Sequence, residues 1–176
     1  IIPPDKRKIH SIGILYHTMA HKGFKYALEA VKKLKEKYSD LEVYIFGVYE
    51  KPDDLPSYCT YLRDATQEQT VDIYNKVSVW LCATIDEGYG LTGLEAMACG
   101  DVLVSTAYAG VFEYAKDEYN ALLSPVKDVA AMAKNVERVF EDKSLRDKLL
   151  NNSKTTVQDF SWEIAVSKFE NALSLQ

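Results

Sequence analysis

The sequence lacks the features that mark several large classes of protein. No run of 18 apolar residues occurs in it, so no membrane-spanning helix is predicted. Acidic residues outnumber basic ones by 26 to 21, which argues against the basic face that nucleic-acid binding requires. Neither a secretory leader nor an initial methionine is present, and we expect the chain to be a piece of a longer protein.

Cysteine is scarce, and its spacing points to no metal site. The three cysteines include no Cys-x-x-Cys pair, and Cys82 and Cys99 lie in apolar runs, where we expect buried thiols. This usage fits a reducing compartment, so a cytoplasmic location is expected. His17 and His21 are four residues apart, but they fall in a predicted loop without an acidic neighbour, so no metal ion is expected there.

The chain has enough apolar residues for one core, because 47% of its 176 residues are hydrophobic. Apolar runs that predict strands alternate with segments of helical periodicity over the whole length. Such alternation predicts an α/β fold with a doubly wound, Rossmann-like parallel sheet, whose ligands bind at the carboxyl ends of its strands. Residues 1–7 are predicted as a linker and 160–176 as a C-terminal helix. The predicted strands are 8–16, 41–47, 58–62, 77–84, 102–105 and 119–123.

The most informative stretch is EGYGLTGLE, residues 87–95, on the turn from the fourth predicted strand to a helix. Its three glycines let the backbone approach a ligand closely, and the first N–H groups of the helix form an anion site. Since amides suit an anion better than carboxylates do, Glu87 and Glu95 are expected to accept hydrogen bonds from neutral hydroxyls. A sugar on one side of a phosphate and a ribose on the other would use both glutamates, and a nucleotide-sugar has this chemistry.

Two helices carry clear signals at their ends. Residues 66–69, Thr-Gln-Glu-Gln, form a capping-box pattern that predicts a helix start. The helix after the glycine-rich turn is predicted from the helical spacing of Leu91, Leu94 and Ala98, and it is predicted to end at Gly100.

The spacing of Glu87 and Glu95, together with the following AMACG, resembles the signature of retaining glycosyltransferases with the GT-B fold, family four (glycosyl transferases group 1). Tyr89 is the one departure within the signature, where relatives have Phe. The resemblance implies that residues 1–176 are the C-terminal, nucleotide-sugar-binding half of a two-domain enzyme. It implies metal-independent transfer, with no cofactor, from a nucleotide-diphosphate sugar to an acceptor sugar or lipid-linked sugar. The acceptor would be held by an N-terminal domain absent from this chain.

The resemblance also implies roles for individual residues. Lys22 and Glu87 are the expected catalytic residues, Lys22 holding the diphosphate and Glu87 the donor sugar. Glu95 would take the ribose hydroxyls. The remaining expected donor contacts are Gly47, Leu62, Arg63, Tyr89, Gly90, Leu91, Thr92 and His17.

His17 is the main departure, because relatives carry an arginine at its position. If a protonated His17 replaces that charge, donor affinity should fall as the pH rises from 6 to 8. Two other interpretations stay open: an epimerase or phosphorylase on the same fold, and a non-catalytic nucleotide-binding module. Relatives act mostly in polysaccharide biosynthesis, and the resemblance therefore implies peripheral contact of the full enzyme with the inner face of a membrane. The chain alone should bind a donor and transfer nothing.

Overall fold

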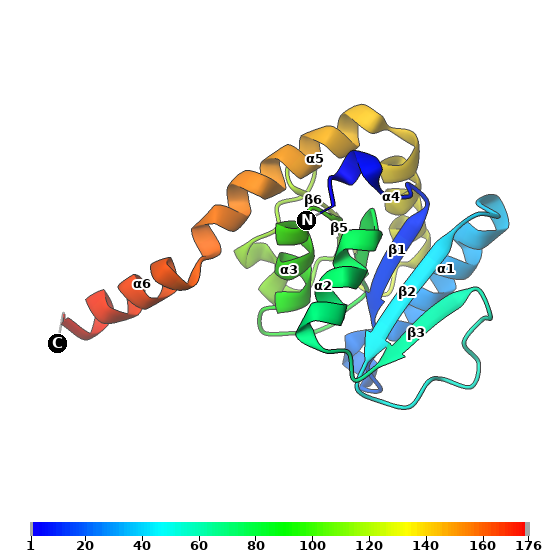
Figure 1. Cartoon of the computed structure of the whole chain (residues 1–176), viewed down its shortest axis with the longest axis horizontal. Helices are drawn as coiled ribbons and strands as arrows, with labels where there is room; N and C mark the ends of the chain where they lie inside the picture. Colours follow the sequence, from blue (N-terminus) through cyan, green and yellow to red (C-terminus); the bar gives the residue numbers. More distant parts are fainter. Residues whose placement is uncertain (1, 175–176) are drawn as a thin grey trace.

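The centre of the protein is a six-stranded parallel sheet with the strand order β3-β2-β1-β4-β5-β6 (Figure 1). The structure is a computed structural model, and it describes residues 2–174. The doubly wound α/β sheet predicted from the sequence is confirmed, since every neighbouring pair of strands is parallel. The strands are β1 (Ser11–Leu15), β2 (Glu42–Gly47), β3 (Cys59–Arg63), β4 (Val79–Cys82), β5 (Val102–Thr106) and β6 (Ala121–Ser124).

Helices cover both faces of the sheet. One core joins the sheet to α1 and α4, and the other joins it to α2 and α3. The helices are η1 (Pro4–Lys6), η2 (Ala20–Lys22), α1 (Phe24–Lys37), α2 (Gln67–Lys76), α3 (Leu91–Cys99), η3 (Ala109–Glu113), α4 (Val129–Glu141), α5 (Lys143–Thr156), η4 (Val157–Phe160) and α6 (Trp162–Ser174).

Strand β4 shows why the sequence pattern predicts a covered sheet. Val79 and Leu81 pack into the core under α1 and α4, whereas Trp80 packs into the core under α2 and α3. All three side chains are buried. A parallel strand with both faces covered needs apolar residues at successive positions, and this is the unbroken run that the sequence contains.

The predicted helix ends are confirmed, and the buried face of α3 is not the one that carries Leu91, Leu94 and Ala98. Thr66 caps α2 in a complete capping box, and Gly100 ends α3 in the left-handed conformation. The buried residues of α3 are Gly93, Ala96 and Met97, whereas Leu91 is 60% exposed. Small side chains let this face of α3 lie close to the core, because a Cβ on Gly93 would stand 2.5 Å from the Tyr114 hydroxyl. Leu91, Leu94 and Ala98, the apolar residues at helical spacing, instead line a groove beside α6.

The two ends of the chain differ from their predictions in detail. The predicted linker contains the 3-10 turn η1, and the side chain of Arg7 is fully buried. Within the predicted C-terminal helix, α6 extends away from the sheet and has no buried residue (Figure 1). Ile1 and residues 175–176, which fall in these two predictions, lie outside the described residues.

The cysteines are only partly as predicted. Cys82 and Cys99 are half-buried rather than buried, because each lies near the end of its element, and Cys59 is the buried one. Among residues 2–174, no helix combines the length and apolar character needed to cross a membrane.

Candidate functional site

The loops after β1 and β4 lie against each other at the carboxyl edge of the sheet. Gly23 has a φ of +70°, and a Cβ at this position would stand 1.8 Å from the carbonyl oxygen of Ala83. The backbone N–H of Ile85 donates to the carbonyl of His21 at 2.7 Å. A glycine is therefore required where α1 begins, and this close approach sets Lys22 beside the loop that carries Glu87.

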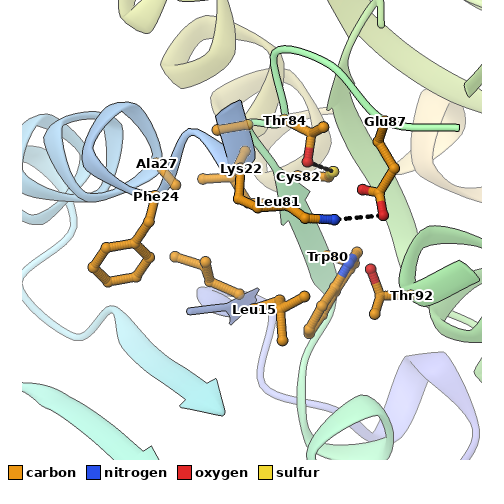
Figure 2. Close-up of a pocket in the computed structure, with 12 residues that line it drawn as sticks. Leu15, Lys22, Phe24, Ala27, Trp80, Leu81, Cys82, Thr84, Glu87 and Thr92 are labelled. Carbon is orange, nitrogen blue, oxygen red and sulfur yellow. Dashed lines mark hydrogen bonds and ion pairs between the residues drawn. The ribbon is translucent and has the colours of Figure 1, made fainter. Parts of the chain in front are cut away.

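Lys22 and Glu87 form an ion pair in the free protein. The Nζ of Lys22 lies 2.6 Å from Oε1 of Glu87, and their side chains are 21% and 27% exposed. Figure 2 shows the two side chains pointing toward each other above Trp80, with Thr92 from the start of α3 directed into the same space. They border a cavity of about 20 Å³, lined also by Trp80 and Thr92. The two residues expected to be catalytic thus pair with each other.

The glycine-rich turn presents free amides next to this ion pair. Gly90 is the N-cap of α3 and has a φ of +85°, which L side chains rarely adopt. The N–H of Gly93 donates back to the Gly90 carbonyl at 3.0 Å. Within residues 2–174, the N–H groups of Gly90, Leu91 and Thr92 have no acceptor. These donors and the helix dipole can together hold an anion.

Glu95 does not line the cavity beside the ion pair, although it lies about one turn along α3 from Thr92. It lines a groove of about 530 Å³ between α2 and α3, whose walls include Phe46 and Ala65. The buried Tyr74 donates its hydroxyl to Oε2 of Glu95 at 3.0 Å. Burial, with the Glu95 charge adding to it, raises the pKa of Tyr74, so its hydroxyl keeps the proton that it donates. Glu95 is otherwise exposed and can accept from a ligand.

His17 is held as a neutral imidazole. Its Nδ1 accepts from the backbone N–H of Met19 at 3.0 Å, and its Nε2 lies 3.2 Å from the Tyr49 hydroxyl. Burial lowers the pKa of His17, and the charges of Lys22 and His21 lower it further. If Nδ1 carried a proton, it could not accept the hydrogen bond from the Met19 N–H. The hypothesis of a charged His17 therefore disagrees with the geometry of the free protein.

Three other expected donor contacts, Gly47, Leu62 and Arg63, lie farther along the carboxyl edge of the sheet and do not touch the Lys22–Glu87 pair. Leu62 and Arg63 are in β3, three strand spacings, or about 14 Å, from β4. Arg63 pairs with Glu50 and Asp64. Gly47 lies against the backbone of Tyr16, where a Cβ would stand 2.5 Å from the carbonyl oxygen.

Tyr89 is half-buried, and its ring lies 5.7 Å from that of Tyr114.

The sequence interpretation missed Tyr74 and Tyr49 as neighbours of the site. Tyr74 could have been found, since a tyrosine on the apolar face of a helix needs a partner for its hydroxyl. Tyr49 falls in an irregular loop and gives no such signal. In the described part of the chain, no group of three or more His, Cys, Asp or Glu side chains could hold a metal ion.

The sheet order and the glycine-rich turn after β4 define a Rossmann-like α/β domain. The chain belongs to the glycosyl transferases group 1 family, whose sequence model matches residues 2–156. Over 172 residues it is 26% identical to an uncharacterized glycosyltransferase of Methanocaldococcus jannaschii. That match covers 92% of this chain and 43% of the relative, so the chain spans less than half of the relative's length.

Solved structures share the fold. The C-terminal domain of the group 1 glycosyltransferase LpcC from Francisella tularensis matches with a TM-score of 0.71 and 23% identity, covering 85% of this chain and 84% of that domain. The pneumococcal O-GlcNAc transferase GtfA, crystallised with UDP and GlcNAc, matches with a TM-score of 0.81 and 22% identity. This second match covers 97% of this chain and 36% of GtfA. The predicted fold, the C-terminal half of a GT-B glycosyltransferase, is confirmed.

Proposed function

We propose that this chain is the donor-binding half of a retaining glycosyltransferase and that it binds a nucleoside-diphosphate sugar without a metal ion. The observation that carries the proposal is the Lys22–Glu87 ion pair beside the free amides of Gly90, Leu91 and Thr92. A cation and several amide donors suit a diphosphate, and a carboxylate beside them suits sugar hydroxyls. The UDP in the similar GtfA structure supports this class of ligand.

The geometry supports an exchange of partners on donor binding. The diphosphate takes Lys22 and the amides, and Glu87 is released to accept hydrogen bonds from the sugar. When the sugar leaves, the same cation and amides stabilise the charge that grows on the departing diphosphate. The acceptor, a sugar or a lipid-linked sugar, is held by an N-terminal domain. This chain alone therefore binds a donor and transfers nothing.

The groove beside Glu95 suits the ribose. Glu95→Ala is expected to weaken UDP binding by about 1.5–3 kcal/mol, the value of a hydrogen bond to a charged group. The loss should be smaller for 2′-deoxy-UDP, which lacks one of the two hydroxyls. Calorimetric titration with both ligands measures this, and Glu36→Ala, an exposed glutamate on α1, is the control. Equal losses for the two nucleotides would show that Glu95 does not contact the 2′-hydroxyl.

His17 is expected to carry little charge at neutral pH and above, because burial lowers its pKa. The affinity ratio of wild type to His17→Ala for UDP-glucose should therefore change little between pH 7 and 8. A sugar-linked donor avoids the second ionisation of a free diphosphate. Titrations at four pH values measure the ratio. A ratio that falls steadily across this range would return His17 to the role of a replacement for arginine.

A further inference from the structure

Two buried tyrosines lie directly beneath the glycine-rich turn, and the mechanism above does not use them. Tyr108 and Tyr114 flank η3 in the connection between β5 and β6, and they are 2% and 4% exposed. They belong to the core under α2 and α3. Their hydroxyl groups contact the backbone of the glycine-rich turn.

The two hydroxyls hold the carbonyls of the turn. The Tyr114 hydroxyl donates to the Gly90 carbonyl at 2.8 Å. The Tyr108 hydroxyl lies 3.0 Å from the Tyr114 hydroxyl and 3.3 Å from the Tyr89 carbonyl. Each hydroxyl has one proton, so the proton that Tyr114 gives to Gly90 leaves Tyr108 as the donor to Tyr114 or Tyr89. Burial raises the pKa of both tyrosines, so both protons are present at neutral pH.

The fit between the tyrosines and the turn requires glycine. A Cβ on Gly90 would stand 1.9 Å from the Tyr108 hydroxyl oxygen, and one on Gly93 would stand 2.5 Å from that of Tyr114. On the neighbouring side, a Cβ on Gly110 would stand 2.4 Å from the Gly88 carbonyl. The turn therefore packs against the β5–β6 connection, through two tyrosine hydroxyls and the backbone of Gly110, with no room for a side chain at these glycines.

The direction of the carbonyls fixes the direction of the amides. In a trans peptide, the C=O and the next residue's N–H point to opposite sides. Carbonyls of Tyr89 and Gly90 that are held inward turn the N–H groups of Gly90 and Leu91 outward. We infer that Tyr108 and Tyr114 are positioning residues that pre-orient these two amides for the diphosphate. The inference rests on the proposed function, and it adds that the anion site is formed before the ligand arrives.

The first test needs no ligand. In the double variant Tyr108→Phe/Tyr114→Phe, the Gly90 carbonyl loses one of its two donors and the turn is no longer held in place, so the Gly93 N–H, which donates to the same carbonyl, should exchange faster. We expect a rise of roughly two- to tenfold, the range for the net loss of one hydrogen bond, measured by NMR amide exchange with β5 amides as reference. Tyr38→Phe is the control, because this buried tyrosine donates to Glu141 and not to the turn.

The second test separates positioning from general destabilisation. UDP affinity of the double variant should fall by roughly two- to tenfold, whereas the affinity for uridine, which has no phosphate, should not change. The control variant should bind both ligands as wild type does. Unchanged Gly93 exchange, or equal losses for UDP and uridine, would overturn the inference. Failure of the proposed function would show separately, as wild type that binds no UDP, and the exchange experiment would still decide whether the tyrosines hold the turn.

Discussion

Replacing Lys22 with alanine is expected to weaken UDP binding by roughly 10- to 150-fold, because it removes one hydrogen bond between a cation and a phosphate. His17 is not expected to replace this charge at neutral pH, because burial lowers its pKa. Calorimetric titration in EDTA measures the loss. Lys33→Ala, on the exposed side of α1, is the matched control and should bind UDP as wild type does. Equal affinities for Lys22→Ala and wild type would remove Lys22 from the diphosphate site.

The ion pair predicts an effect of opposite sign at its other member. Glu87→Gln releases Lys22, so UDP should bind up to about fivefold more tightly, the value of a partly exposed ion pair. A UDP-sugar should gain less or lose affinity, because the amide accepts more weakly from sugar hydroxyls than the carboxylate does. The preference for UDP-sugar over UDP should fall. Equal weakening of both ligands would contradict the exchange of partners proposed here.

The largest expected effect on stability is at Arg7. The side chains of Arg7 and Asp101 are both fully buried and paired, and Arg7 also donates to the carbonyls of Tyr74 and Val77 at 3.0 Å. Arg7→Met should cost about 3–5 kcal/mol, because it leaves a carboxylate buried without its partner. Urea unfolding measures the loss.

The pH dependence identifies the cause. Burial raises the pKa of Asp101, and Arg7 opposes this rise. Removing Arg7 raises the folded pKa further above the unfolded one, so the deficit of Arg7→Met should be smaller at low pH and grow as the pH rises. Adding Asp101→Asn should recover part of the loss at pH 8. A double variant as unstable as Arg7→Met at that pH would show that the carboxylate charge is not the cause.

The sequence predicted the elements better than their contacts. The apolar run of β4 and the capping box at Thr66 depend on neighbouring residues, so a local pattern predicts them. The spacing of Leu91, Leu94 and Ala98 did not indicate the buried face of α3, because apolar residues occur on more than one face of this helix. Gly93 determines which face of α3 is buried, because its missing side chain allows contact with Tyr114.

Contacts between distant residues could not be predicted in the same way. The sequence indicated Lys22 and Glu87 separately, but their ion pair depends on the approach of Gly23 to Ala83. Arg7 has no local sign that its partner is 94 residues away. The neutral state of His17 depends on the Met19 amide and Tyr49, which only the folded loop brings together.

The most direct test of the central claim is calorimetric titration of this chain with UDP, GDP, ADP and UDP-glucose, in EDTA and again with magnesium. Because Lys22 and the amides of α3 meet the charge of the diphosphate, we predict that at least one of these nucleotides binds at one site, with the same affinity in both buffers. No binding of any nucleotide at millimolar concentration, or binding that strictly requires magnesium, would contradict the account.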